Sequence, residues 1–289
     1  ARHVDFLHVR CPSNLGLLTL LLSNFDALPA YRWVKYAGNW QPNGKEPSSY
    51  ALQRRILQKN YFKGVVTING EWPKQPKHVY SFYNPCLTDA ELEIGNVATH
   101  QKELSPPYQL LYVGRLESAK GVGRILQIAA LLNEYGIAFE LNLIGDGPEK
   151  EDFVALAKEL NISKQTRFYG WKPRSELGEY YSKAHFIILP SSASEGWPKV
   201  LSEAMAYGAV PIASNVSSIP QFLKKIKTGA TLDPQDVEGF AITIRHFIQH
   251  ADLWKEASIA ANAGANFFTY TYYLSEVKRL FKNAWNLEL

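Results

Sequence analysis

The hydrophobic positions of the chain fall into short runs that alternate between two spacings. Apolar stretches at residues 110–113, 139–144, 167–169, 186–189 and 210–213 predict β-strands. Between them, apolar residues at helical spacing predict helices over residues 123–135, 149–160, 175–183 and 198–207. The last of these begins at Pro198 and ends before Gly208, which is the usual placement of these two residues at helix ends. Strands that alternate with helices of this length indicate an α/β fold with a parallel, doubly wound sheet.

The first hundred residues repeat this pattern less completely. Strands are predicted at residues 6–9, 33–36, 65–68 and 79–82, and helices at 14–22 and 49–60. Residues 89–107 carry mixed charge and end in Ser-Pro-Pro, which is typical of a linker. Because a strand follows so soon after Ala1, we expect that further residues precede it or that another chain covers its edge.

Three regions are therefore expected. Residues 1–104 would form a partial amino-terminal Rossmann-like domain with its linker, and residues 105–268 a second Rossmann-like domain. Residues 269–289 are aromatic and amphipathic, so they are expected to form a helix that packs across toward the first domain.

Composition narrows the class of protein. The 289 residues are 46% hydrophobic and 20% charged, with a net charge of +4, which is ordinary for a globular chain. The charge suits an anionic ligand or a lipid surface, but the basic cluster near Lys224 is explained as a cationic helix end, so no nucleic acid is expected. Cys11 and Cys86 lie far apart and form no metal-binding pair, which favours a reducing cytoplasm. The longest apolar run, residues 15–22, is too short to span a bilayer.

Chemistry is expected in the loops that follow the strands, because ligands of open parallel sheets bind at the carboxyl ends of the strands. Residues 114–121 place Arg115 and Lys120 beside glycines and a helix amino terminus, an arrangement that suits a diphosphate. A solvated surface loop explains the same residues. Gly145 and Gly147 allow a ligand to approach the backbone closely, although a tight turn would require them equally.

A pair of carboxylates follows the strand at 186–189. Glu195 lies in the loop and Glu203 nearly two turns inside the helix that begins at Pro198. A carboxylate on an otherwise apolar helix is costly to bury unless it is hydrogen-bonded, so Glu203 needs a partner or a ligand. Two such acceptors could hold separate hydroxyl groups of an elongated ligand. Glu195 alone is also explained as an acid at a helix amino terminus.

These segments together resemble the retaining glycosyltransferases of family 4, which have the GT-B fold of two facing Rossmann-like domains. Glu195 and Glu203 match the E-x7-E motif of that family, and the sequence from Glu195 to Gly208 matches it nearly throughout. Further matches are Gly114-Arg115-Leu116 with Lys120-Gly121, Ile144-Gly145-Asp146-Gly147-Pro148, and Phe168-Tyr169-Gly170. The resemblance covers roughly residues 108–273.

The resemblance implies a role for each matched residue. Arg115 and Lys120 would bind the donor diphosphate and stabilise the charge on it as it leaves, Glu195 would face the hydroxyls of the transferred sugar, and Glu203 would bind the ribose. The nucleobase would rest near residues 170–173. The other implied donor contacts are Gly114, Gly145, Gly147, Gly170, Gly196, Trp197, Pro198, Lys199 and Val200.

The implied reaction is transfer of a sugar from a UDP-, GDP- or ADP-linked donor to a hydroxyl of a carbohydrate or lipid-linked acceptor. The sequence contains no DxD motif, so no metal and no cofactor are expected. A cytoplasmic location with peripheral contact at the inner membrane face would allow a lipid-linked acceptor. His8 and Arg10, at the end of the first strand, could reach the cleft, although a strand-end histidine is more often structural.

The chain departs from the family pattern in two places. Ser217 and Ser218 stand where the family often has two glycines, and Gln221 stands where it has a glutamate. The front of the chain resembles only the latter half of the family's amino-terminal domain, so that domain is expected to be incomplete. The alternative function is therefore a module that binds a nucleotide sugar without turning it over.

Overall fold

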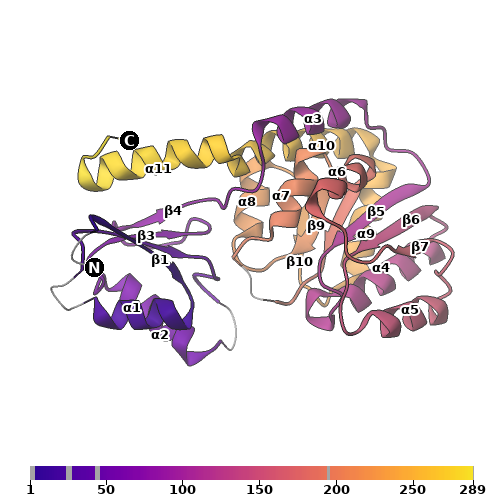
Figure 1. Cartoon of the computed structure of the whole chain (residues 1–289). Helices are drawn as coiled ribbons and strands as arrows, with labels where there is room; N and C mark the ends of the chain where they lie inside the picture. Colours follow the sequence, from indigo (N-terminus) through magenta and orange to yellow (C-terminus); the bar gives the residue numbers. More distant parts are fainter. Residues whose placement is uncertain (1–3, 24–27, 43–45, 194–195, 289) are drawn as a thin grey trace.

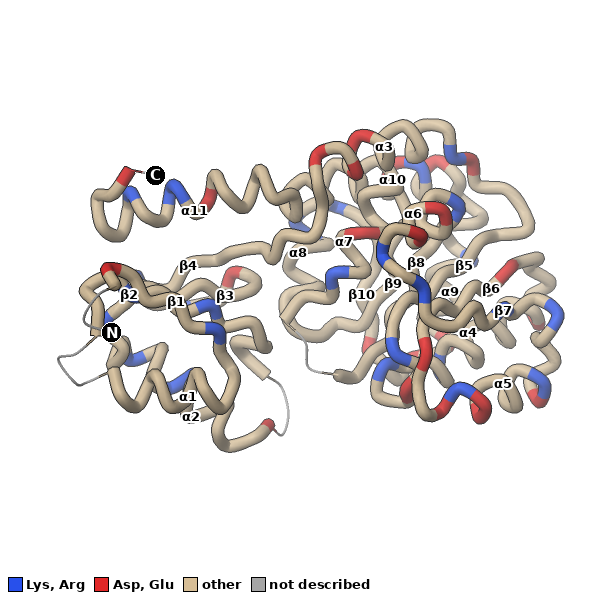
Figure 2. Tube along the Cα trace, in the orientation of Figure 1, with Lys and Arg blue, Asp and Glu red and all other residues tan. Residues whose placement is uncertain are grey.

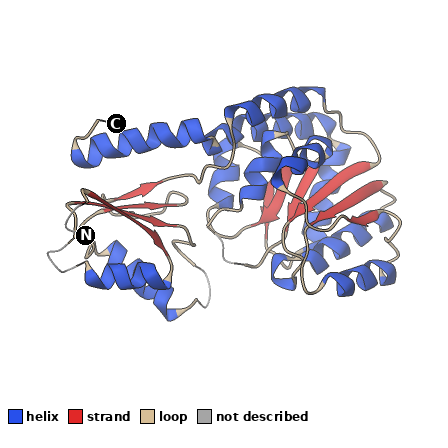
Figure 3. Cartoon of the chain, in the orientation of Figure 1, coloured by secondary structure: helices blue, strands red, loops and turns tan. Residues whose placement is uncertain are grey.

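The computed structural model describes residues 4–23, 28–42, 46–193 and 196–288, and contains two parallel β-sheets side by side (Figure 1). The first sheet has four strands in the order β1-β2-β3-β4, and the second has six in the order β10-β9-β8-β5-β6-β7. Figure 3 shows the two sheets with helices packed around them. The fold is α/β, as the alternation of strands and helices predicts.

The first sheet consists of β1 (Phe6–Cys11), β2 (Tyr31–Tyr36), β3 (Val65–Ile68) and β4 (Val79–Ser81). Side chains of successive strand residues point to opposite faces, so each face collects alternate residues. One face packs against α1 (Asn14–Leu22) and α2 (Ser48–Gln58), with Val9, Val34 and Val66 in that core. The other face packs against α11 (Tyr270–Trp285), with Trp33 and Leu280 at the centre of the contact.

The second sheet has the strand order of a doubly wound nucleotide-binding fold. Its strands are β5 (Tyr108–Val113), β6 (Phe139–Ile144), β7 (Thr166–Phe168), β8 (Phe186–Leu189), β9 (Val210–Ser214) and β10 (Ala230–Leu232). The chain starts at β5 in the middle, builds outward to β7, and then returns to β8 on the other side of β5. The switch point therefore lies between the carboxyl ends of β5 and β8, where such sheets bind ligands.

Helices cover both faces of the second sheet. One layer contains α4 (Val122–Glu134), α5 (Lys150–Glu159) and α9 (Val237–Gln249), and the other contains α6 (Arg174–Lys183), α7 (Lys199–Ala206) and α10 (Ala251–Ala265) (Figure 1). A further helix, α8 (Ile219–Ile226), follows β9. No helix in the described ranges is long and apolar enough to cross a membrane.

The interpretation of residues 89–107 as a linker is wrong for most of the segment, because it contains the 13-residue helix α3 (Asp89–Gln101). Thr88 and Glu91 form a capping box that starts this helix. It packs so closely on α7 that a Cβ atom at Gly95 would lie 2.1 Å from the carbonyl oxygen of Ala206. The hydrophobic pattern did not predict this helix, because its sequence has mixed charge and its buried contacts are made by small residues. The domain boundaries at residues 104 and 268 stay predictions.

The chain passes between the two halves twice, and the two passages are hydrogen-bonded to each other. The backbone N–H groups of Cys86 and Leu87 donate to the carbonyl of Phe268, and the N–H of Tyr270 donates to the carbonyl of Leu87. The second passage leads directly into α11, which lies along the first sheet (Figure 1). The first half is therefore completed by a helix that follows the whole second half in sequence.

Candidate functional site

The loops that follow β5 and β8 meet at the switch point of the second sheet. The loop after β5 forms a single 3-10 turn, η1 (Ser118–Lys120), before α4 begins. The N–H of Ser192 donates to the carbonyl of Ala119 at 3.1 Å. Arg124 on α4 donates from Nε and Nη2 to the carbonyl of Pro190 at 2.9 and 2.8 Å. The loop that carries Lys120 is thereby fixed beside the segment that leads to residues 196–203.

The glycines of these loops are required mainly by contacts between neighbouring loops. A Cβ at Gly145, where φ is 139°, would lie 1.8 Å from the carbonyl oxygen of Gly114, and one at Gly147 would lie 2.2 Å from that of Leu116. The N–H of Gly145 donates to the carbonyl of Gly170, so the loops after β5, β6 and β7 form one backbone layer. These contacts between loops explain the two glycines without a ligand, and the close approach of a ligand to their backbone stays a prediction.

Arg115 and Lys120 lie in the loop after β5 and differ in their surroundings. The Arg115 side chain is 71% exposed and forms an ion pair with Glu117. Lys120 is half-buried, and burial together with the charge of Arg115 lowers the pKa of its amine, while Glu117 acts in the opposite direction. A bound anion would stabilise the charged ammonium form of Lys120 and so raise the pKa of its amine.

Glu203 is only 8% exposed, and its two carboxylate oxygens are both bound within the protein. Arg174 donates to Oε1 at 3.2 Å and Tyr181 donates to Oε2 at 2.9 Å. Arg174 also pairs with Glu91 at 2.8 Å and donates to the carbonyl of Cys86. The burial of Glu203 is thus offset by internal partners, and two lone-pair positions remain for further donors.

The sequence did not single out Arg174 and Tyr181. Burial alone would lower the pKa of Arg174, but its hydrogen bonds to Glu91 and Glu203 raise that pKa. Burial, followed by the charge of Glu203, raises the pKa of Tyr181, so its hydroxyl stays protonated. The available signal was the position of Arg174, which starts α6 directly after the loop that follows β7.

The segment 196–200 is buried in its first three residues and reaches the surface at Lys199. Trp197 is buried, with its ring stacked 5.0 Å from that of Phe268 and its Nε1 donating to Ser202 at 2.7 Å. Pro198 precedes α7, while Lys199 is exposed and Val200 is half-buried. Glu195 lies outside the described residues.

Gly196 lies at one of the contacts between the two halves. A Cβ there would lie 2.2 Å from Nδ2 of Asn69 and 2.3 Å from the carbonyl oxygen of Ala37, two residues that follow β3 and β2. The hydroxyl of Ser218 donates to the carbonyl of Gly196 at 2.7 Å. Only a residue without a side chain fits here, and the carboxyl ends of the two sheets therefore face each other across this glycine.

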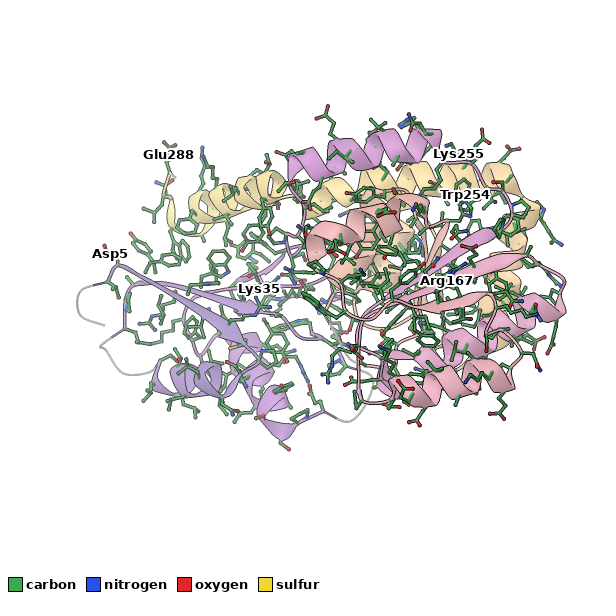
Figure 4. All side chains as sticks on the ribbon, turned by 45° about the vertical axis from the view of Figure 1, so that its right-hand side comes forward. Asp5, Lys35, Arg167, Trp254, Lys255 and Glu288 are labelled. Atoms are coloured by element: carbon green, nitrogen blue, oxygen red, sulfur yellow. The ribbon has the colours of Figure 1, made fainter. Side chains whose placement is uncertain are left out.

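The first half contributes basic residues at the same edge. His8 and Arg10 lie on the face of β1 toward α11, with the His8 ring 4.5 Å from that of Trp33. Lys35, which the sequence did not single out, is 5% exposed and donates to Oδ1 of Asn69 at 3.1 Å and to the carbonyl of Phe82 at 3.3 Å. Figure 4 shows Lys35 on the side of the first sheet nearest the second half.

Burial and the charge of Arg10 together lower the pKa of Lys35 to about 7. Burial, then Arg10 and Lys35, lower the pKa of His8. Within the described ranges, Arg10 makes no ion pair with a carboxylate. This edge of the first sheet is therefore electropositive and carries a buried amine that changes charge near neutral pH.

The loop after β7 carries an exposed aromatic side chain. Gly170 has a φ of 72°, and a Cβ placed there would meet nothing within 4 Å. The next residue, Trp171, is 72% exposed. An exposed indole beside open space, three residues before the first residue of α6, is suited to stacking on a planar ring.

Comparison with known proteins places the chain in a family. Residues 98–265 match the family model described as glycosyl transferases group 1, which is more than half of the chain. The chain belongs to the group 1 glycosyltransferases. In the parts of the chain that the structure describes, no group of three or more His, Cys, Asp or Glu residues could hold a metal ion.

Relatives of this group 1 glycosyltransferase agree with that assignment. The amylovoran biosynthesis glycosyltransferase AmsK of Erwinia amylovora is 28% identical over 151 residues, which is 50% of this chain and 37% of AmsK. This chain thus spans well under half the length of that relative.

Solved structures show the GT-B fold. Sucrose-phosphate synthase from Thermosynechococcus elongatus superimposes with a TM-score of 0.73 at 19% identity, covering 96% of this chain and 73% of the other. HepE of Anabaena, solved in complex with UDP, gives a TM-score of 0.71 at 15% identity, covering 94% and 78%.

Proposed function

We propose that this chain carries the donor-binding part of a retaining, metal-independent glycosyltransferase of family 4, acting on a nucleotide-diphosphate sugar. The observation that supports this most strongly is the meeting of four elements at one place. The Arg115–Lys120 loop, the loop after β8, the Glu203 network and the Gly196–Asn69 contact all lie at the carboxyl edges of the sheets. Each suits a different part of one elongated ligand.

The diphosphate would lie against Lys120 and Arg115 at the amino terminus of α4. The two cations would neutralise the charge that develops on the leaving phosphate, and the phosphate would accept the proton of the attacking hydroxyl. Attack from the same face as the departing diphosphate would retain the configuration of the sugar. The acceptor would be a carbohydrate or a lipid-linked glycan at the inner membrane face.

The nucleoside would lie between the loop after β7 and α7. Glu203 would accept hydrogen bonds from the ribose with the lone pairs that Arg174 and Tyr181 leave unused. The indole of Trp171 would stack on the base. The transferred sugar would face the backbone of Gly196, with Asn69 of the first half directly opposite.

A thermal-shift panel of UDP-, GDP- and ADP-sugars tests the proposal. A nucleotide sugar supplied at a hundred times its dissociation constant stabilises the folded state by about 2.7 kcal/mol, so the matching donor should raise the melting temperature. Lys120→Ala and Glu203→Ala should weaken this shift, and Lys158→Ala, an exposed lysine on α5, should leave it unchanged. The absence of a shift with all three classes of donor would overturn the assignment.

The second candidate function is nucleotide-sugar binding without turnover. It is favoured by the share of AmsK that the chain spans, 37%. Both candidates predict the same thermal shift, so they are separated by product formation. Release of nucleoside diphosphate from the matching donor by this chain supports the enzyme, whereas binding without release supports the module.

A further inference from the structure

A cavity of about 330 Å³ lies at the junction of the two halves, between β4, α8 and α11. Its walls include Tyr80, Phe82, Tyr272 and Asn283. A second cavity of about 350 Å³ continues from it past Gln221 on α8. The two share Glu71, Tyr83 and Lys225, so they form one groove, which we term the junction groove.

The residues that line the junction groove are not among the candidate donor-site residues, although one of them, Ser218, donates to the carbonyl of Gly196. Neither cavity includes Arg115, Lys120 or Glu203. Its walls come from the loop after β3, the chain after β4, α8 and α11, and so from both halves of the molecule. A ligand here would contact the two halves at once.

The charges of the groove cancel locally. Lys225 pairs with Glu71 at 3.1 Å, and Arg279 pairs with Glu276. Each cation of the lining therefore has an acidic partner within the lining, unlike the electropositive edge near Lys35. An anionic ligand would have to break these pairs, whereas a neutral ligand leaves them intact.

The neutral groups of the groove combine flat apolar rings with unused hydrogen-bonding capacity. Burial is the main factor that raises the pKa of Tyr83 and of Tyr272, so both hydroxyls stay protonated. The hydroxyl of Tyr83 already accepts from Lys225 at 3.5 Å and retains its O–H donor. The side chain of Asn283 makes no hydrogen bond within the described part of the chain, and it is exposed. Gln221 accepts from the N–H of Glu71 at 2.8 Å with its carbonyl oxygen, which leaves its amide N–H groups available.

We propose that the junction groove binds a neutral oligosaccharide, at a site separate from the donor site. A sugar ring has an apolar face that packs on an aromatic ring and a rim of hydroxyls that need both donors and acceptors. The tyrosine rings supply the surface for the apolar face of the sugar. Asn283, Gln221 and the tyrosine hydroxyls supply the donors and acceptors for its hydroxyls. The size of each cavity lies within the range of small-molecule sites. This proposal does not depend on the identity of the nucleotide donor.

Binding of uncharged hexasaccharides to the whole chain tests the proposal. Maltohexaose and cellohexaose are titrated by isothermal calorimetry, with an oligogalacturonate of the same length as the anionic probe. At least one neutral hexasaccharide should bind with a dissociation constant on the order of 1 mM, a typical strength for a weak site. The oligogalacturonate should bind more weakly.

Variants locate the binding. Asn283→Ala, at an exposed position that folding tolerates, should weaken hexasaccharide binding several-fold, and Tyr272→Ala should weaken it about tenfold or more, the equivalent of about 1.4 kcal/mol. Tyr61→Ala is the matched control, because Tyr61 is 57% exposed on the first half and lies outside the groove. Lys120→Ala should not change hexasaccharide binding, which separates this site from the donor site.

Three results would overturn the proposal. The first is no binding of either neutral hexasaccharide at about 10 mM, ten times the expected dissociation constant. The second is binding that Asn283→Ala and Tyr272→Ala leave at the level of the unaltered protein. The third is stronger binding of the oligogalacturonate than of the neutral chains, which would contradict the cancellation of charge in the groove.

Discussion

The two halves of the molecule differ in how the basic side chains at the carboxyl edges of their sheets are paired. At the edge of the second sheet, two arginines of the candidate site pair with carboxylates: Arg115 pairs with Glu117, and Arg174 pairs with Glu91 and Glu203. At the edge of the first sheet, burial and then the charge of Arg10 raise the cost of protonating Lys35. Figure 2 shows the same contrast, with Lys and Arg outnumbering Asp and Glu in the first half and both signs mixed around the second sheet.

The halves also differ in how they complete their cores. The second sheet is covered by helices that directly follow its strands, and β8 and β9 are buried along their whole length. One face of the first sheet depends on α11, which packs Phe281 and Trp285 against Phe6. We therefore expect the second half to depend less on distant segments for its stability than the first half, whose order should depend on α11.

The largest effect is expected from Trp33→Ala in the first half. Trp33 is 7% exposed, contacts the rings of Phe82 and Phe281, and donates to Thr67 at 2.8 Å. Its removal should lower the free energy of unfolding by about 3–5 kcal/mol, measured by denaturant titration followed by circular dichroism. Nucleotide binding by the second half should survive under mild conditions, because α11 is not part of the candidate donor site.

Trp171→Ala is the matched control for that experiment. Trp171 is 72% exposed, so its removal should change the free energy of unfolding by no more than about 0.5 kcal/mol. Equal destabilisation by the two tryptophan substitutions would contradict the proposed difference between the halves.

An intermediate effect, visible only as a pH dependence, is expected from Lys35→Met. The pKa of Lys35 is about 7 in the folded protein, against 10.5 for an ordinary lysine. Between these values the unfolded chain binds more protons than the folded one, so the free energy of unfolding increases as pH rises through this window. Methionine cannot titrate, so the variant should gain less stability than the unaltered protein between about pH 7 and pH 9.

Denaturant titrations of both proteins across this pH range measure the difference directly. Other groups that titrate in the range are common to both chains and cancel. If the free energy of unfolding changed equally with pH in the two proteins, Lys35 would have an ordinary pKa. The electropositive edge would then not lower that pKa.

The smallest effect is expected from Lys225→Met, which breaks the ion pair with Glu71 between the two halves. Lys225 and Glu71 are 46% and 66% exposed, so solvent screens the pair. The coupling energy in a double-mutant cycle with Glu71→Gln should be about 0.2–1 kcal/mol and should fall as salt is added. A coupling energy above that range would indicate that this ion pair holds the halves together more firmly than the exposure of Lys225 and Glu71 suggests.

Much of the fold could be predicted from hydrophobic spacing, because buried parallel strands are almost wholly apolar. The strands at 65–68, 139–144 and 186–189 have the same bounds in the structure as in the sequence-based prediction. The helix α10 gave no comparable signal. Apart from Trp254, its buried face is made of small residues, with Ser258 donating to the carbonyl of Gly208 and Asn262 to that of Ala206, so close backbone packing largely replaces large apolar side chains.

The candidate site was predicted only where it follows local sequence. The loop with Lys120 and the helix with Glu203 lie at strand ends, as the pattern indicated. The partners of Glu203 could not be predicted, because Arg174 and Tyr181 are 29 and 22 residues away and meet it only after the sheet has formed. Lys35 was missed for a similar reason, since an alternating strand gives no indication of which polar residue is buried.

The double passage between the halves has a consequence for synthesis on the ribosome. The first sheet is translated early, but α11 follows the whole second half in the chain. Until α11 emerges, Trp33 and Phe82 have no helix to cover them, so the nascent first half carries an uncovered aromatic face while the second half is being made. The order of translation therefore leaves the covering of this face of the first sheet to α11, after the second sheet has been made.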